Sequence, residues 1–460
     1  MSTDPDNNTC PNTSAIQVFV DSAPELVGDS SENESDKKKK KSRNVSFPDE
    51  DQLVTQYFEP ANPWQNAAST SKAQLAAEYL ESCRRHGTPA IDSVLQQIRE
   101  LPETAIGGAT RAPRLTLSEC VLQGSAPADA LEAVLRRVQF RRLEIHQAVI
   151  DDEGAEAIFD MIEYYESAIV VSINGERQFG IRGWQAASRM IKKSAELSEL
   201  EVSDSALEAA HAPVLARALR PLTCRLRALC LQRCSLCGEP LLCLAVFAVL
   251  ARALRPLTCR LRALCLQRCS LCGEPLLCLV IALKSNSSVR ELRLGDNRLG
   301  PSDAAQIAAL LRLNARIQLL DLSNNQIQDT GLGHIADALV EQGAQTPPSA
   351  AASPASPVSP HRCPMTGYEA RGLAFLVLWN NQLTRNCAAH LSKALRSSQS
   401  LCVLNIGRNA VGTEGVRALC AGGALISVGL QAARLGPDAA PAVAELIGQN
   451  NTLQVRERER

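Results

Sequence analysis

Hydrophobic residues along this chain follow two spacings that alternate. Within Ile317–Leu339, Leu320 and Leu322 are two residues apart, so in an extended strand their side chains lie on one face. Asn325 follows where the strand must turn, and an asparagine amide can bond several backbone groups at once. The spacing then changes to that of a helical face, formed by Leu332, Ile335, Ala336 and Leu339. This stretch is therefore expected to form a strand, a turn and a helix.

The same unit recurs with a period of about 28 residues, which lies in the range of leucine-rich repeats. Counting from the residue three before the first strand leucine, the units start near Ala112, Phe140, Ala168, Leu197, Leu226, Leu261, Val289, Ile317, Leu373, Leu401, Leu425 and Leu453. Each unit can bury its leucines only against its neighbours. We therefore expect an α/β leucine-rich-repeat solenoid, a ribonuclease-inhibitor-like horseshoe with strands on its concave face.

Two regions precede the array. Residues 1–51 are polar and have no hydrophobic period, which predicts a disordered N-terminal arm. Residues 52–111 are expected to form a helical cap that covers the open end of the array, which extends over 112–460. One cap helix is predicted over about Ser71–Arg85, and a second is predicted to start at Thr88-Pro89.

The array has two irregularities and an abrupt end. A Pro/Ser-rich insertion at 343–371 interrupts it, and this segment is either a genuine loop or a retained non-coding stretch. Val214–Leu244 is repeated without a change as Val249–Leu279, through a very recent duplication or an assembly error. The offset of this copy exceeds one period, so the extra copy must loop out or lengthen one helix. The chain stops at Arg460 as a new strand would begin, and we expect a poorly capped last layer.

The duplication produces a spacing of cysteines that is typical of zinc sites, with the residues Cys234, Cys237, Cys269 and Cys272. Yet Cys234 and Cys269 fall at the turn position that other units fill with Asn297, Asn325, Asn381 and Asn409. Buried cysteine commonly behaves as a small hydrophobic residue. We interpret these cysteines as structural thiols and expect no metal site.

Composition and motifs argue against an enzyme. The 6 histidines are scattered, and none has a spacing to a cysteine or carboxylate that suggests a nucleophile or a metal cluster. The glycine pairs lack the context that phosphate binding needs. We therefore expect no catalytic residue and no cofactor.

Charge and hydropathy limit the partners and the compartment. The net charge is −1, so no global field attracts nucleic acid or membrane. The start of the chain has no secretory signal. The longest apolar run, Leu241–Ala251, is about half of the roughly 20 residues that span a bilayer. We expect an intracellular protein of cytoplasm or nucleus, monomeric apart from its partner, whose 17 cysteines are reduced.

The arm carries the candidate binding site. Lys37–Lys41 is a run of lysines, and Arg43, Val45, Ser46 and Phe47 follow it. Val45 and Phe47 are two residues apart, so they share one face of an extended peptide. This is the layout for adding a strand to the edge of a partner's sheet, with two pockets for alternate side chains.

This motif resembles the short docking motif by which regulatory subunits bind protein phosphatase 1: a basic residue, Val or Ile, any residue but Pro, then Phe or Trp. Longer segments resemble the leucine-rich-repeat regulatory subunits of this phosphatase, namely Val45–Pro48, Asn62–Trp64, Phe159–Ser167, Arg182–Ala187 and Val377–Thr384. The resemblance covers about Lys41 to Leu446. It implies an inhibitor that binds the protein phosphatase 1 catalytic subunit through Arg43, Val45, Ser46 and Phe47.

The chain departs from this family at 343–371, where the family runs more directly between repeats, and at its end, where the family continues. Two other functions remain open. A general protein-interaction scaffold would bind an unrelated protein on its concave face, and its arm would be incidental. A basic tail that binds nucleic acid is disfavoured, because no aromatic residues that could stack on bases lie near the lysines.

Overall fold

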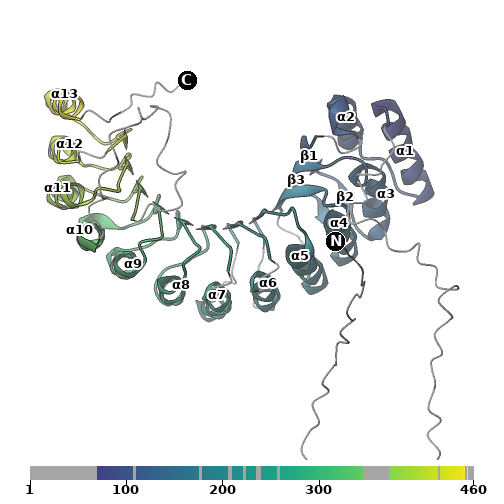
Figure 1. The fold of residues 1–460 in the computed structure, drawn as a ribbon, viewed down its shortest axis with the longest axis horizontal. Helices are drawn as coiled ribbons and strands as arrows, with labels where there is room; N and C mark the ends of the chain where they lie inside the picture. The colour runs from purple at the N-terminus through teal and green to yellow at the C-terminus, as the bar shows by residue number, and fades with distance from the viewer. Residues whose placement is uncertain are drawn as a thin grey trace, which may run out of the picture. The chain divides into compact units, whose positions relative to one another are not determined.

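A computed structural model describes residues 70–106, 110–175, 179–205, 210–220, 224–234, 240–255, 259–345, 372–422, 425–450 and 453. All of them belong to one compact unit, residues 59–460. Strands and helices alternate along this unit, with the strands on one side and the helices on the other (Figure 1). The arm that the sequence predicts to be disordered lies outside the described residues.

The strands form one parallel sheet in which the spatial order follows the chain. Its 11 strands are β1 (Ala112–Ser118), β3 (Phe140–His146), β5 (Ala168–Asn174), β6 (Glu199–Ser203), β7 (Ala228–Gln232), β8 (Ala263–Gln267), β9 (Glu291–Arg293), β10 (Leu319–Asp321), β11 (Phe375–Val377), β12 (Val403–Asn405) and β13 (Ser427–Gly429). A second sheet pairs β2 (Val121–Leu122) with β4 (Val149–Ile150). Consecutive parallel strands need a long connection, which each helical segment provides.

The register of this sheet confirms the predicted repeat. Leu115 is paired with Leu143, Leu143 with Val171, and so on along the array. The same row continues through Leu200, Leu229, Leu264, Leu292, Leu320, Leu376, Leu404 and Val428. A shift by one residue would turn every buried leucine to the other face, so burial fixes this register.

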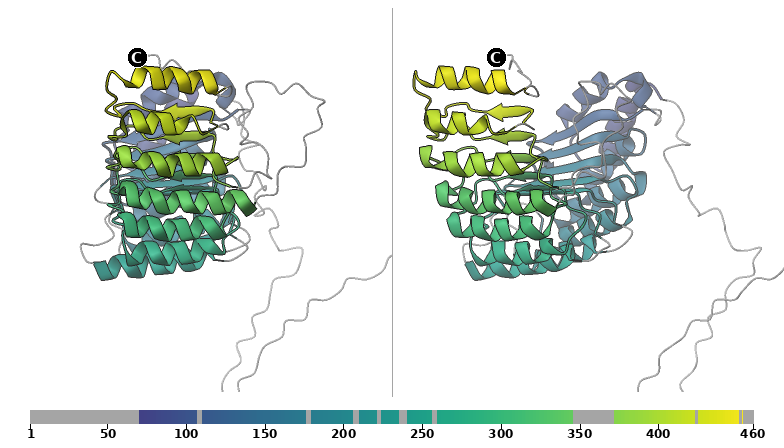
Figure 2. Two further views of the ribbon diagram at one scale, coloured as in Figure 1. Left: turned by 90° about the vertical axis from the view of Figure 1, so that its left-hand side faces the viewer. Right: turned by 60° about the vertical axis from the view of Figure 1, so that its left-hand side comes forward.

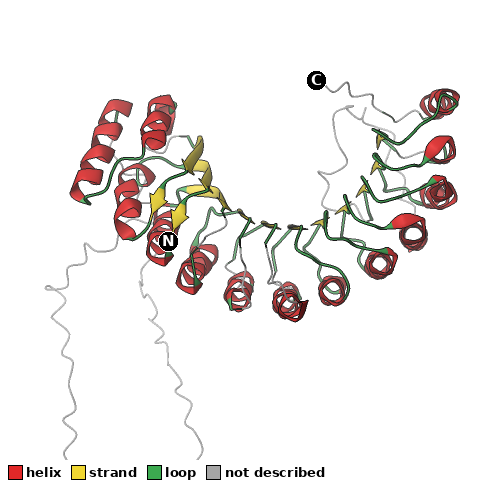
Figure 3. Ribbon diagram, turned by 180° about the vertical axis from the view of Figure 1, so that it is seen from behind, coloured by secondary structure: helices red, strands yellow, loops and turns green. Residues whose placement is uncertain are grey.

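The helices cover the outer side of the strands, as the secondary-structure view shows (Figure 3). They are α3 (Ser125–Leu135), α4 (Asp152–Tyr165), α5 (Ile181–Lys193), α6 (His211–Leu219), α7 (Pro240–Leu254), α8 (Glu274–Lys284), α9 (Pro301–Leu313), α10 (Gln328–Gln345), α11 (Ala388–Ser397), α12 (Gly412–Leu419) and α13 (Ala439–Gln449). In Figure 2 the green and yellow helices lie parallel, each beside the next. None of the helices in the described part of the chain combines the length and the apolar character needed to cross a bilayer. The expected leucine-rich-repeat solenoid is thus confirmed.

Two helices precede the first strand of the array. α1 (Lys72–Arg85) begins as predicted, because the hydroxyl of Ser71 accepts a hydrogen bond of 3.2 Å from the Gln74 N–H. α2 (Asp92–Glu100) begins later than Thr88-Pro89, so that predicted start is wrong. The Ile91 N–H donates to Tyr79 Oη at 3.1 Å, and this bond draws the segment before Asp92 onto α1 instead of into a helix.

The exact copy takes the place of one whole repeat. β7 and β8 are neighbours, with Leu229 paired to Leu264 and Cys230 paired to Cys265. α7, between them, has 15 residues, whereas α6 has 9 and α8 has 11. α7 is thus four residues longer than α8 (15 − 11), so the helix takes up part of the extra length of the copy, and the connections on either side of it take up the rest.

The segment 346–371 also lies outside the described residues. α10 continues to Gln345, so the first three residues of the range 343–371 are helical. A side chain at Gly343 would collide with the carbonyl oxygen of Ser397, so only glycine lets this helix pass so close. Beyond the segment the ladder resumes without a shift, since Leu320 is paired with Leu376.

Candidate partner-binding surface

The exposed face of the sheet is the main surface that the repeats present to a partner. In each strand the leucines point inward, and the residues between them point to the other face. One row of such residues crosses the array: Thr116, Glu144, Ser172, Glu201, Cys230, Cys265, Arg293, Asp321, Val377 and Asn405. The side chains of this face are mainly charged in the N-terminal strands and include several apolar ones in the C-terminal strands.

Charged side chains occupy the N-terminal part of this face. The Arg142 guanidinium spans β5 and donates to both carboxylate oxygens of Glu201, at 2.5 and 3.1 Å. Thr116 Oγ1 donates to Glu144 Oε2 at 3.0 Å. These bonds link β1 to β3 and β3 to β6, and Arg142 neutralises the charge of Glu201.

The two glutamates of β6 differ in acidity. Burial raises the pKa of Glu199, and the charge of Glu201 raises it further. Burial also raises the pKa of Glu201, but the hydrogen bonds and charge of Arg142 outweigh it, so the net pKa is lowered. Glu201 is therefore the ionised partner of Arg142.

Apolar side chains occupy the C-terminal part of the face. They are partly exposed and come from three neighbouring strands and the turn after β11: Leu319, Phe375, Val377, Trp379 and Val403. The Trp379 ring lies against Gly407, where any added Cβ would collide with it. Aromatic side chains of this kind are enriched at binding hot spots. We call these five residues the apolar patch.

The turns after the strands are joined by a ladder of buried asparagines. Asn325 Nδ2 donates to the carbonyls of Leu294, Leu322 and Ser323, at 2.9 to 3.3 Å. Its Oδ1 accepts from the backbone N–H groups of Asn297 and Leu299, at 2.9 and 3.0 Å. Asn297, Asn381 and Asn409 repeat the pattern. One side chain thus satisfies several buried backbone groups that the turn would otherwise leave unpaired.

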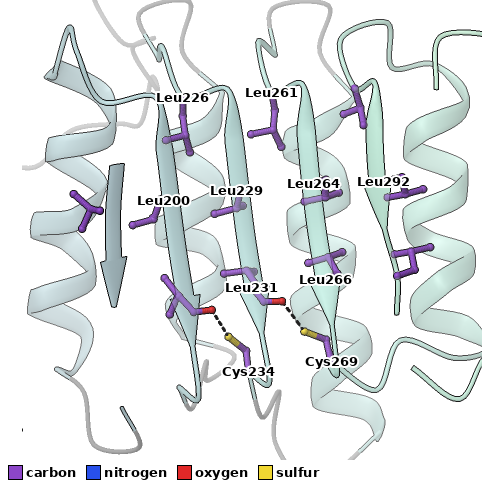
Figure 4. Packing of buried hydrophobic residues seen from close by; sticks show 14 of the residues in the cluster. Leu200, Leu226, Leu229, Leu231, Cys234, Leu261, Leu264, Leu266, Cys269 and Leu292 are labelled. Carbon is purple, nitrogen blue, oxygen red and sulfur yellow. Dashed lines mark hydrogen bonds between the residues drawn. The ribbon is translucent and has the colours of Figure 1, made fainter. Parts of the chain in front are cut away.

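Two of the candidate zinc ligands occupy this same turn position. The Cys269 thiol donates to the carbonyl of Leu231 at 3.2 Å, and the Cys234 thiol donates to that of Val202 at 3.5 Å (Figure 4). Burial raises the pKa of Cys234 to about 12, so its thiol is protonated at neutral pH. Their burial and their bonds to backbone carbonyls support the interpretation of Cys234 and Cys269 as structural thiols.

The other two cysteines are placed differently. Cys272 is exposed, and Cys237 lies outside the described residues. Within the ranges that the structure describes, no three His, Cys, Asp or Glu side chains are grouped closely enough to hold a metal. Zinc binding itself therefore stays a prediction for experiment.

The predicted docking residues Arg43, Val45, Ser46 and Phe47 all lie outside the described residues, so they remain predictions. The sequence interpretation missed the apolar patch as a surface. Its signal was present, because Phe375, Val377 and Trp379 alternate with the buried leucines of β11. Alternate residues of a repeat strand are normally polar, and three bulky apolar ones indicate a covered or binding surface.

The repeats, and most of the chain, are similar to known proteins. A family model described as "Leucine Rich repeat" matches residues 285–308, 314–336 and 397–420. The chain is 33% identical over 365 residues to "Protein phosphatase 1 regulatory subunit 37" of Bos taurus, and 37% identical over 365 residues to the protein of the same name from Homo sapiens. Each match covers 78% of this chain and 42% of the relative.

Among solved structures, the "Crystal structure of Rad7 and Elc1 complex in yeast" contains a similar chain, with 15% sequence identity and a TM-score of 0.48. That match covers 83% of this chain and 87% of the other.

Proposed function

We propose that this leucine-rich-repeat chain, which resembles protein phosphatase 1 regulatory subunit 37, is a regulatory subunit that binds protein phosphatase 1 and inhibits it. The observation that carries the proposal is the identity of 33% and 37% to the two relatives over 78% of this chain. The motif Arg43–Phe47 supports it independently. The chain spans 42% of each relative's length, so the proposal concerns the segment that it shares with them.

Two surfaces share the binding in this proposal. Val45 and Phe47 enter two pockets beside an edge strand of the phosphatase, and Arg43 and the lysine run add charge attraction that salt screens. The apolar patch supplies a second contact, centred on Phe375 and Trp379. The repeats hold their side chains rigidly, so this second contact costs little ordering entropy compared with the arm. A partner that binds the arm and the apolar patch together is held more tightly than by either contact alone, because binding at one site raises its effective concentration at the other.

The chain acts in this proposal by occupying a surface and not by chemistry. We infer that it has no catalytic residue and needs no cofactor, and that it works inside the cell, where protein phosphatase 1 would meet it. Inhibition then means that the bound arm and repeats exclude substrates from the catalytic subunit.

The test is the affinity of the full chain for the protein phosphatase 1 catalytic subunit, with Val45→Ala/Phe47→Ala as the variant. Burying a Val or Phe side chain contributes roughly 1.5–3 kcal/mol, so removing both should cost about 3–6 kcal/mol, or roughly a hundredfold to ten-thousandfold in affinity. Val18→Ala/Phe19→Ala is a matched control, because it removes the same side chains from the same arm. Unchanged affinity of the first variant, with the repeats folded by circular dichroism, would end the docking proposal.

A general scaffold is the second candidate, and the apolar patch is the observation that favours it. Trp379→Ala separates the two functions in the full chain. If the scaffold function is right, this variant loses its cellular partner while Val45→Ala/Phe47→Ala retains it. If the phosphatase function is right, the arm variant has the larger effect on phosphatase affinity and on inhibition of phosphatase activity.

A further inference from the structure

Three arginines form a ladder where neighbouring strands begin. The Arg262 N–H donates to the carbonyl of Arg227 at 2.7 Å, and the Arg290 N–H donates to the carbonyl of Arg262 at 2.7 Å. These residues therefore lie side by side at the starts of β7, β8 and β9. Adjacent strands are about 4.8 Å apart, so the ladder carries one guanidinium for each step of that length.

Three further arginines widen the ladder. Arg225 and Arg260 each precede a ladder arginine by two residues, with a buried leucine between them, so both point away from the core. Arg316 precedes the buried Ile317 in the same way, and Gln318, not an arginine, follows Arg290 along the ladder. We call these six residues the arginine edge: Arg225, Arg227, Arg260, Arg262, Arg290 and Arg316. The first four are exposed and the last two are half-buried.

The charges of the arginine edge act on one another. Burial lowers the pKa of Arg290, and the positive charges of Arg316 and Arg262 lower it further. The polar contacts of Arg290 and Arg225 are with backbone carbonyls, those of Ser287 at 2.9 Å and Ala195 at 3.2 Å. Like charges held at strand spacing repel, and a bound anion would relieve this repulsion.

Other arginines of the same repeats are neutralised. Arg233 pairs with Asp204, Arg268 pairs with Asp296, and Arg293 pairs with Glu291, at 2.5, 3.5 and 3.1 Å. By contrast, in the described part of the chain Arg225, Arg227, Arg260, Arg290 and Arg316 have no carboxylate within 4.0 Å. Among the described residues, acids therefore lie beside Arg233, Arg268 and Arg293, whereas none lies beside these five arginines.

We propose that the arginine edge binds an acidic segment of a partner polypeptide. A guanidinium presents a planar fork of donors that matches a carboxylate, and neighbouring forks suit a run of Asp and Glu side chains. A nucleic acid fits less well, because single strands bind to stacking aromatic side chains. The one aromatic residue between 224 and 316 is Phe247, which is buried. This proposal does not depend on the phosphatase function.

The probe is a fluorescently labelled oligoglutamate peptide, titrated with the full chain at low and at high salt. Arg227→Gln/Arg262→Gln/Arg290→Gln should weaken binding roughly tenfold, as the sum of three partly exposed ion pairs. The matched control, Arg233→Gln/Arg268→Gln/Arg293→Gln, removes the same charge from the same repeats and should bind like the wild type. The change to lysine at the three ladder positions keeps the charge and should retain part of the binding.

Three results would overturn the proposal. The first is no binding of the peptide at low salt. The second is an equal loss in the ladder variant and the matched control, since this would show attraction by net charge alone. The third is tighter binding of a labelled oligothymidylate of equal charge, which would assign the edge to nucleic acid. Circular dichroism on each variant confirms folding, and Arg225→Gln/Arg260→Gln provides a second, milder variant that should weaken binding by a smaller factor.

Discussion

Asn381 Nδ2 donates a hydrogen bond of 2.8 Å to the carbonyl oxygen of Leu322, across a sequence gap that includes the whole segment 346–371. The two residues belong to repeats that are adjacent in space, since β10 and β11 are paired in register. The ladder of turn asparagines therefore continues across a long interruption in the sequence. At this point the turn asparagines therefore add backbone hydrogen bonds to a register that the buried leucines already fix.

Asn325→Ala should lower the free energy of unfolding by about 2–4 kcal/mol, because it leaves two buried N–H groups and several carbonyls without partners. The measurement is urea denaturation followed by circular dichroism. Asn386→Ala is the control, since Asn386 is exposed, and it should change stability by less than about 0.5 kcal/mol. Equal effects of the two substitutions would contradict the role of the asparagine ladder.

Alkaline pH should destabilise the repeats through Cys234. Burial raises the pKa of its thiol to about 12, whereas an unfolded chain has a cysteine pKa of about 8.5. The folded state then binds the proton more tightly, so this stabilisation is fully present below about pH 8.5 and is lost as pH rises toward 12. The free energy of unfolding should fall by up to about 1.4 kcal/mol per pH unit for this thiol.

Urea titrations at pH 7.5 and pH 10 test this prediction, with Cys234→Ala as the comparison. The variant should lose part of the pH dependence. Cys272→Ala is the matched control, because Cys272 is exposed, and it should keep the slope of the wild type. Identical slopes for the wild type and Cys234→Ala would show that the buried thiol does not contribute.

Purified protein should contain no stoichiometric zinc. Cys234 and Cys269 direct their thiols to backbone carbonyls of the preceding repeat, so these sulfurs are already used within the turns. Metal analysis after purification without chelators is the measurement. Stoichiometric zinc that is lost in Cys237→Ser or Cys272→Ser would support the zinc site instead.

Phosphorylation of Ser46 should weaken docking to protein phosphatase 1. Ser46 lies between Val45 and Phe47 and would face away from their pockets, next to the partner's edge strand. A phosphate adds roughly −1.5 to −2 charges and a bulky solvated group at that place. The measurement compares peptides with and without phosphoserine at 46. If both bound the catalytic subunit equally tightly, this form of regulation would be ruled out.

The sequence predicts the register of the sheet well, because buried leucines recur at the same position in each repeat. Leu115, Leu143 and Leu320 pair with the residues that the spacing assigns to them. The start of α2 could not be predicted in the same way, since it depends on Tyr79, a residue of another helix. The residue types at Thr88-Pro89 favour a helix start there, but the helix begins only at Asp92, after the residue whose N–H bonds to Tyr79.

The surfaces were harder to predict than the core. The motif Cys-Arg-Leu-Arg-Ala-Leu stands twice in the sequence, at 224–229 and 259–264, but its arginines become a surface only when the register aligns Arg227, Arg262 and Arg290. The apolar patch likewise needs Val403 from one strand beside Phe375 from another. Each such surface combines residues from several repeats, whereas sequence spacing describes one repeat at a time.

The exact copy at β7 and β8 gives this array a local translational symmetry. Ala228 to Gln232 and Ala263 to Gln267 present the same side chains, displaced by one strand spacing of about 4.8 Å. A ligand that recognises the residues of one copy therefore finds the same residue types one strand away, although β6 flanks one copy and β9 flanks the other. The duplication therefore offers such a ligand a second register on the sheet, where a diverged repeat would have offered a different set of side chains.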